Sequence, residues 1–328
     1  MNVPLVSIGL PVYNGGERIA GALDSILRQS FTDFEVVIVD NASTDDTGAI
    51  CQDYAQRDRR ICYFRNATNI GVNPNHDRVF EYSHGKYFAW FADDVEYAPD
   101  TLARCVAEIE RASATPLVLV HPRCQIIRDG RPLSLAEQKS IASNSPRAWR
   151  RLAVVLSKVG LVNQLFGLIR ADVLRKTRLN GLYASSDYVL LAELAMQGEL
   201  REIPEVLIRR RIDSNRGTAA VHRDLQAWKA WLGAARRRSL ADALPYRERL
   251  AFEYLRAAWH SPIGALDKFM CLACILPVHY ERTSRVVRVG ARLMRPWRWR
   301  RWWQQRRLRR SQNPETCPPS GEATASHE

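Results

Sequence analysis

The N-terminal part of the chain alternates short apolar runs with segments whose apolar residues follow helical spacing. Residues 5–10 and 34–39 are near-continuous apolar runs, which are typical of strands buried on both faces of a parallel sheet. Between them, over residues 17–29, apolar residues recur at the spacing of one helical face. The order strand, loop, helix, strand predicts a parallel α/β sheet with right-handed crossovers.

The same reasoning extends along the rest of the chain. It predicts helices over 44–56, 75–82, 99–112, 150–158 and 187–197, and strands over 61–65, 86–92 and 117–121. An apolar run follows at 165–169, the stretch up to 144 is polar, and residues from about 221 onward are helical and amphipathic. We therefore expect an α/β fold with a mixed, mainly parallel central sheet flanked by helices and a helical C-terminal extension.

Polar side chains stand at the carboxyl ends of the predicted strands: Asn14, Asp40, Asn69 and the pair Asp93-Asp94. Ligands of open α/β sheets bind beyond these ends, so we expect one site there. The pair Asp93-Asp94 suits magnesium or manganese bridging to a diphosphate, although a solvated strand end would explain it too. Residues 40–46 offer acceptors for a base N–H or a ribose hydroxyl, and helix capping explains 43–46 equally well.

Other well-known motifs are missing from the sequence. It contains neither a G-x-x-x-x-G-K-[ST] loop nor a G-x-G-x-x-G fingerprint, which disfavours ATPases and dinucleotide enzymes. H-E-x-x-H and G-x-S-x-G are also absent, which disfavours hydrolases.

Composition, the N-terminal segment and the cysteines indicate the compartment in which we expect the protein. The 328 residues are 46% hydrophobic, enough for a sizeable core in one large or two small domains. The N-terminus lacks a signal-peptide pattern, and no run approaches the roughly 20 apolar residues of a membrane span. Seven cysteines, with one C-x-x-C at Cys271 and Cys274 and no second pair, suit reduced thiols. We expect a cytoplasmic protein.

The net charge of +13 is concentrated near the C-terminus. Residues 295–310 hold eight arginines and no acid, so 13 − 8 leaves +5 for the rest of the chain. Tryptophans interleaved with these arginines favour an anionic membrane surface as the partner. A solvated helix and nucleic acid are the alternatives, and we expect no nucleic acid. The last segment, 311–328, has the composition of a disordered tail.

Four segments in order resemble the family 2, inverting glycosyltransferases of the GT-A fold. They are Ser7-Ile8-Gly9-Leu10-Pro11-Val12-Tyr13-Asn14, the stretch Val36 to Thr47 with Asp40-Asn41-Ala42-Ser43 at its centre, Asn69-Ile70-Gly71, and Ala92-Asp93-Asp94 with Pro99. The resemblance covers about residues 4–215. It implies a GT-A-like, Rossmann-like fold and transfer of a sugar from a nucleoside-diphosphate sugar to an acceptor hydroxyl.

The resemblance also implies roles for individual residues. Asp94 would ligate a divalent cation, Mn or Mg. Asp187, in Ser185-Ser186-Asp187-Tyr188, would be the catalytic base at a helix start, where the helix dipole alone would also favour an acid. Seven residues would contact the nucleotide sugar: Pro11, Tyr13, Asn14, Asp40, Asn69, Gly71 and Asp93.

Two positions depart from the family pattern. Phe91 stands where many members have the first acid of the metal-binding strand, so one carboxylate is missing. Asp213 stands after the Arg-rich segment 209–211, where many members have a histidine; it could bind the metal, or the role could be lost. The arginines could steady a diphosphate or be solvated.

These inferences define the expected organisation and function. Residues 1–220 would form a GT-A catalytic domain, 221–310 a helical extension with the basic Trp/Arg-rich segment, and 311–328 a disordered tail. The enzyme would act on a saccharide or lipid-linked acceptor in surface polysaccharide or glycolipid synthesis, peripherally on the inner face of the cell membrane. The alternative is a catalytically impaired, membrane-attached protein that binds nucleotide sugars.

Overall fold

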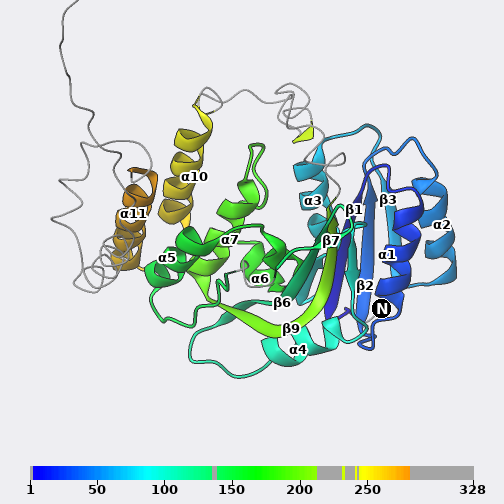
Figure 1. Ribbon diagram of the computed structural model, residues 1–328, viewed down its shortest axis with the longest axis horizontal. Coiled ribbons are helices and arrows are strands. Elements are labelled where there is room, and N and C mark those ends of the chain that lie inside the picture. Colours follow the sequence, from blue (N-terminus) through cyan, green and yellow to red (C-terminus); the bar gives the residue numbers. More distant parts are fainter. Residues whose placement is uncertain (1–2, 135–138, 213–230, 233–240, 242–243, 281–328) are drawn as a thin grey trace, which may run out of the picture. The chain divides into compact units, whose positions relative to one another are not determined.

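The computed structural model describes residues 3–134, 139–212, 231–232, 241 and 244–280. The sheet and the helices that flank it belong to one compact unit, Met1–His279. The first part of this unit alternates strands and helices as expected (Figure 1). Its elements are β1 Val6–Val12, α1 Glu17–Leu27, β2 Phe34–Asp40, α2 Thr47–Arg57, β3 Ile61–Arg65, α3 Val72–Glu81 and β4 Tyr87–Trp90.

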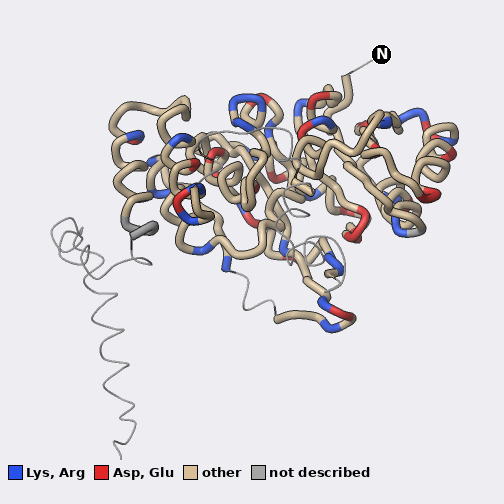
Figure 2. The backbone as a smooth tube through the Cα atoms, turned by 90° about the horizontal axis from the view of Figure 1, so that it is seen from above, with Lys and Arg blue, Asp and Glu red and all other residues tan. Residues whose placement is uncertain are grey.

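The second part continues the sheet and adds helices. Its elements are β5 Val95–Tyr97, α4 Thr101–Ile109, β6 Leu117–Arg128, β7 Arg131–Pro132, α5 Ala148–Lys158, η2 Asn163–Phe166, β8 Leu168–Arg170, α6 Ala171–Leu174, α7 Ser186–Gln197, β9 Glu199–Ile212, α10 Tyr246–His260 and α11 Ala265–Tyr280. In the described part of the chain, no helix has both the length and the apolar character needed to cross a bilayer. Basic and acidic residues are interspersed over these elements (Figure 2).

The nine strands found in the described residues form one mixed sheet in the order β3-β2-β1-β4-β8-β6-β9-β5, with β7 paired to β6. Strands β1 to β4 pair in parallel, and so do β6 and β9. β8 runs antiparallel between β4 and β6, and β5 runs antiparallel to β9. The expected α/β fold with a mixed sheet is therefore confirmed, and the ends of β1, β2 and β4 lie at the same edge.

The sheet has a hydrophobic core on each face. In β2, Val36 and Ile38 belong to the core that also contains residues of α1 and α4, whereas Val37 and Val39 belong to the core that contains residues of α3. Side chains alternate between the two faces of a strand, so a run apolar at every position requires cover on both sides. Gly9 of β1 allows α3 to approach, because a Cβ there would lie 2.7 Å from a methyl group of Val79.

Two predicted strands are longer than the sequence indicated. β1 continues through Pro11, which pairs in register with Val39. The β1–β4 ladder ends at Gly9, so the N–H that proline lacks falls on the side where no strand follows. β6 continues to Arg128 because β9 pairs with it along the whole length of β6. In the second half of β6, exposed and buried side chains alternate, as at Arg123 and Cys124.

Helix α7 is the centre of the core in the second part. Nine of its residues are buried, and α5 and α10 pack against it (Figure 1). Arg151 of α5, which is 4% exposed, donates to the carbonyl oxygens of Ala195 (2.6 Å) and Met196 (2.7 Å) in the last turn of α7. It also donates to the Ser145 carbonyl at 2.6 Å. These bonds satisfy carbonyl groups that a helix end cannot pair by itself.

We predict that Arg151→Met lowers the free energy of unfolding by about 3 kcal/mol, because it leaves buried carbonyl groups without donors. Chemical denaturation of the full chain measures the change. The exposed neighbour provides the control, since Arg150→Met removes the same charge without uncovering a buried acceptor and should change stability by less than about 0.5 kcal/mol. Equal effects of the two substitutions would contradict the assignment.

Candidate active site

The loops after β1 and β2 are joined by hydrogen bonds at the predicted edge. Asn14, with a φ of +50°, donates its N–H to Ser43 Oγ at 2.9 Å, and its Oδ1 accepts from the Thr44 N–H at 2.9 Å. Asn14 thus orients the two loops toward each other. The neighbouring Tyr13 ring is 48% exposed and offers a flat apolar face beside this junction.

Asp40 lies at the end of β2 with a fully buried side chain. Its Oδ1 accepts from the Ser43 N–H at 2.8 Å, and its Oδ2 accepts from Tyr63 Oη at 2.9 Å and Arg65 Nη1 at 2.5 Å. The ion pair with Arg65 compensates the buried charge, which would otherwise be costly. Both oxygens are engaged within the protein, so Asp40 holds the loop in place, and its expected contact with a base stays a prediction.

The loop after β3 is fixed by asparagine side chains. Asn69 Oδ1 accepts from Asn41 Nδ2 and from the Gly71 N–H, both at 2.9 Å. Asn41 Oδ1 in turn accepts from Asn66 Nδ2 at 3.0 Å, and Asn75 Nδ2 donates to the Val39 carbonyl at 2.9 Å. Gly71 has a φ of +93°, which favours glycine. The motif Asn69-Ile70-Gly71 therefore sets the shape of a loop at the same edge.

The acidic pair after β4 faces two arginines from distant segments. Asp93 Oδ2 pairs with Arg18 Nη2 at 2.7 Å, and Gly15 lies against it, since a Cβ there would be 3.3 Å from Asp93 Oδ2. Burial raises the pKa of Asp93, while Arg18 opposes this shift. Arg18 also donates to the Asn14 carbonyl at 3.4 Å, which joins the acidic pair to the first two loops.

Arg210 of β9 lies at the meeting point of the remaining groups. Its Nε is 3.4 Å from Asp94 Oδ2, its Nη1 donates to Asn163 Oδ1 at 3.0 Å, and its guanidinium lies over the Phe166 ring. The register of β5 with β9 places Arg210 opposite Val95, directly beside Asp94. The sequence did not decide whether the arginines at 209–211 bind a diphosphate or are solvated. In the structure Arg209 and Arg211 are exposed, whereas Arg210 is half-buried and lies in the site.

Asp187 is the second residue of α7 and is half-buried. Burial raises the pKa of its carboxyl group, and the positive charge of Arg210 acts in the opposite direction. One carboxylate oxygen accepts from the Tyr188 N–H at 3.1 Å. A carboxylate with a raised pKa takes up a proton more readily than one with the ordinary pKa, as a general base requires.

The loop before α7 is held by helix α3. Asn73 donates from Nδ2 to the Gly181 carbonyl and, at 3.0 Å, to Ser186 Oγ. One turn further along α3, Asp77 Oδ1 accepts from the N–H and the Nδ2 of Asn180, at 3.0 and 2.9 Å. Nothing in the sequence pattern singled out these contacts, which connect the helix after Gly71 to the segment that ends at Asp187.

Comparison with known proteins identifies a family for the segment that carries these loops. The model of the family described as "Glycosyl transferase family 2" matches residues 7–160, which include β1 to β4 and the acidic pair. Residues 7–160 therefore form a glycosyl transferase family 2 domain. The resemblance seen in the sequence motifs is thereby confirmed.

Several curated relatives of this chain carry the name glycosyltransferase. An uncharacterized glycosyltransferase, EpsJ, of Bacillus subtilis is 34% identical over 106 residues, 32% of this chain and 30% of that protein. An uncharacterized glycosyltransferase of Haemophilus influenzae is 27% identical over 231 residues, 67% of this chain and 69% of that protein. The match to EpsJ thus spans about a third of that relative's length.

The fold is also shared with a solved structure. S. aureus TarS 1-349 in complex with UDP-GlcNAc aligns with a TM-score of 0.57 and 18% sequence identity, over 91% of this chain and 78% of that chain. At this identity the likeness concerns the fold alone. It confirms the expected GT-A-like architecture of the chain.

Four of the predicted site residues, Asp40, Asn14, Asp93 and Asp94, are linked along one edge. Ser43, Arg18 and Arg210 provide the connecting contacts, and the charge of Arg210 also acts on Asp187. Pro11 lies inside β1, on the strand that leads to Asn14. Asp213 and residues 295–310 lie outside the described part of the chain. Among the described residues, no group of three or more His, Cys, Asp and Glu side chains is placed to hold a metal ion.

We predict that the unfolding free energy of wild type falls relative to that of Asp77→Asn as the pH rises from about 4 to 8. Burial raises the pKa of Asp77 to about 7, whereas an unfolded aspartate titrates near 3.9. At low pH the Asp77 carboxyl is protonated in both states. Between about pH 3.9 and 7 only the unfolded state loses this proton, so the folded protein loses stability over that range, and the loss is complete once the buried carboxyl has ionised.

Denaturation curves at several pH values should show the difference between the two proteins growing by about 2 to 4 kcal/mol. Glu96→Gln, an exposed acid-to-amide change on β5, is the control for removing a negative charge. Parallel pH profiles for wild type and Asp77→Asn would contradict the prediction.

Proposed function

We propose that the protein is an inverting glycosyltransferase that moves a sugar from a nucleoside-diphosphate sugar to an acceptor hydroxyl. The observation that carries the proposal is the position of Arg210. It pairs with Asp94 at the end of β4, and its charge acts on Asp187 at the start of α7. The carboxylate proposed for the donor side thus pairs with the guanidinium whose charge also acts on the half-buried carboxylate proposed for the acceptor side.

The donor would occupy the edge formed by the first loops. Tyr13 offers its exposed ring to a base, and the loop shaped by Asn69 and Gly71 borders the same space. Asp93 would lie near the ribose or the sugar. The family match supports this placement, because it covers the segments that carry these residues.

The reaction would be a single displacement at the anomeric carbon. The acceptor oxygen attacks the anomeric carbon, and the bond between this carbon and the diphosphate oxygen breaks. The proton of the acceptor hydroxyl goes to the Asp187 carboxylate. Burial of Asp187 favours this proton transfer, and attack opposite to the leaving group inverts the configuration. Arg210 is positioned to balance the negative charge that develops on the diphosphate.

A divalent cation would be held by Asp94 together with phosphate oxygens of the donor. Magnesium typically takes one or two protein carboxylates plus substrate phosphates, so a site without a cluster of three ligands still fits it. The long 3.4 Å contact to Arg210 leaves Asp94 able to accept a cation. When bound, the cation would stabilise the departing diphosphate.

The acceptor and the cell location are part of the proposal. We infer a saccharide or lipid-linked acceptor in surface polysaccharide or glycolipid synthesis, on the inner face of the cell membrane. Exposed apolar side chains on the C-terminal helices support membrane attachment, because Trp259 and Phe269 are 65% and 67% exposed. The Trp/Arg-rich segment 295–310 follows them in the sequence.

We predict that Asp187→Asn lowers the rate of sugar transfer by a factor of about 10² to 10⁴ but leaves donor binding intact, because it removes only the proton acceptor. Asp94→Asn should abolish the stimulation of donor binding by manganese. Transfer is assayed with a panel of nucleoside-diphosphate sugars, and binding is measured by thermal shift with UDP, GDP and their sugars.

The exposed pair of Asp172 with Arg170 supplies the control, since Asp172→Asn changes an acid remote from the proposed chemistry and should retain activity. Full transfer activity in Asp187→Asn would refute its role as the base. If wild type binds donors but transfers no sugar to any acceptor tested, the alternative of an impaired nucleotide-sugar-binding protein would hold.

We further predict that the full chain sediments with vesicles containing anionic lipid, whereas a chain truncated before Arg295 stays in the supernatant. Each cation near such a surface contributes roughly 1 kcal/mol, so binding should weaken as salt increases. Neutral phosphatidylcholine vesicles serve as the control. Equal sedimentation of the full and truncated chains would exclude the segment as the anchor, and retention on RNA instead of vesicles would favour nucleic acid.

A further inference from the structure

Helix α10 lies in the C-terminal extension but contacts the helix that carries Asp187. The sequence predicts this extension over 221–310, and the family match ends at residue 160. α10 packs directly against α7 (Figure 1). Burial raises the pKa of Tyr254 in α10, and the nearby Tyr246 and Asp187 add to the shift. α10 therefore reaches the surroundings of the proposed base.

Ion pairs fix the segment before α7 to α10. Arg178 Nη1 pairs with Glu253 Oε2 of α10 at 2.7 Å, and its Nη2 donates to the Glu253 carbonyl oxygen at 3.0 Å. Arg178 Nε also pairs with Glu193 Oε1 of α7 at 2.6 Å. The Arg249 guanidinium of α10 lies over the Tyr183 ring, 5.0 Å from its centroid. Both glutamates are buried, so their charges require these partners, and the pairs hold α10 in place beside α7.

Tyr246, the first residue of α10, contacts the residue at which α7 starts. Its Oη lies 2.7 Å from Ser185 Oγ, so the two hydroxyl groups form a hydrogen bond. Ser185 has a φ of +63°, in the left-handed region that residues with a Cβ rarely adopt. A residue keeps such a conformation only where its surroundings hold it, and the Tyr246 hydroxyl supplies one such contact.

The backbone of Ser185 shares a hydrogen-bond donor with the carboxylate of Asp187. The Tyr188 N–H donates to the Ser185 carbonyl oxygen at 3.2 Å and to Asp187 Oδ1 at 3.1 Å. A change in the Ser185 backbone therefore moves the donor that orients the carboxylate. The residue between them is held by α3, because Asn73 Nδ2 donates to Ser186 Oγ at 3.0 Å.

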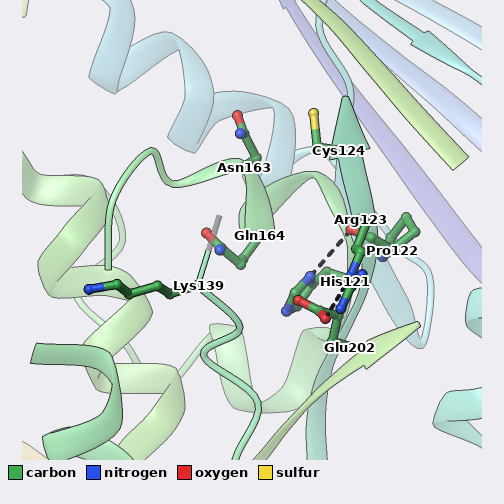
Figure 3. Close-up of a pocket in the computed structure, with 8 residues that line it drawn as sticks. All are labelled: His121, Pro122, Arg123, Cys124, Lys139, Asn163, Gln164 and Glu202. Carbon is green, nitrogen blue, oxygen red and sulfur yellow. Dashed lines mark hydrogen bonds and ion pairs between the residues drawn. The ribbon is translucent and has the colours of Figure 1, made fainter. Parts of the chain in front are cut away.

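The positive charge that acts on Asp187 is held by another element. Asn163 Oδ1 accepts from Arg210 Nη1 at 3.0 Å, so Arg210 is oriented from η2 and not from α10. Asn163 also lines a small pocket with His121 and Gln164, which has room for about one water molecule and none for a substrate (Figure 3). Loss of the Tyr246 hydroxyl should therefore disturb Asp187 and leave Arg210 in place.

We infer that Tyr246 is a positioning residue for Asp187, because its hydroxyl group holds Ser185 in the left-handed conformation from which α7 starts. The inference rests on the proposed function, in which Asp187 takes the proton of the attacking hydroxyl group. The extension then supplies a residue on which the active site depends, although it lies outside the segment that the family model matches.

The test is hydrolysis of UDP-glucose, UDP-N-acetylglucosamine and GDP-mannose by the full chain, in which water replaces the acceptor and Asp187 takes its proton. Tyr246→Phe and Ser185→Ala each remove the same hydrogen bond and should lower kcat about tenfold. The KM for the donor should change less than about twofold, because the bond lies on the α7 side of the site. The double variant should be no slower than either single variant.

Ser185→Gly separates positioning from a general loss of structure. Glycine adopts a positive φ without a supporting contact, so this variant should hydrolyse the donor faster than Ser185→Ala does. Tyr82→Phe is the matched control. It removes the hydroxyl group of an exposed tyrosine that stacks on Phe64 of β3, and it should keep the kcat of wild type.

Hydrogen exchange of peptides that contain residues 186–190 reports on the start of α7 without turnover. Exchange should become about tenfold faster in Tyr246→Phe and Ser185→Ala but not in Tyr82→Phe. If wild type hydrolyses none of the three donors, this comparison alone decides.

Two results would overturn the inference: exchange is unchanged in both variants, or Tyr246→Phe keeps the kcat of wild type while Asp187→Asn is inactive. Because Tyr246 and Ser185 are substituted independently, a folding failure of one variant leaves the other as the test. Full hydrolysis by Asp187→Asn would instead sink the proposed base, and it is told apart from a failure of the inference by this variant.

Discussion

The parallel pairing of β1 with β2 and β4 is the constraint on which the site depends. Parallel strands end at the same edge, so residues that follow β1, β2 and β4 are brought together although they are far apart in sequence. Asn14, Asp40 and Asp93 lie there for this reason. Their positions depend on cores above and below the sheet, which explains the unbroken apolar character of β2.

The edge is strongly polar, and its charges are matched in pairs. Asp40 pairs with Arg65, Asp93 with Arg18, and Asp94 more loosely with Arg210. A fully buried carboxylate such as Asp40 serves to hold a loop, because its oxygens are already engaged. The longer contact of Asp94 leaves that carboxylate more open to a cation than the other two.

The second part of the sheet supplies the groups that face the first. β9 brings Arg210 to Asp94, and α7 brings Asp187 to the same region. The loop before α7 is held by Asn73 and Asp77 of α3, which starts directly after Gly71. One helix thus connects the loop at the proposed nucleotide side with the segment that carries the proposed base, so the two sides have a common mechanical support.

The sequence by itself determined the alternation of strands and helices, the edge at which polar residues gather and the family, because hydrophobic periodicity and short motifs are local. It did not reveal the partner of Asp94. Arg210 is 116 positions away, and only the register of β9 against β5 selects it over its neighbours. The same holds for Asn163, His121 and Gln164. Their environment exists only once β6, β9 and η2 are packed together, and no local pattern encodes that packing.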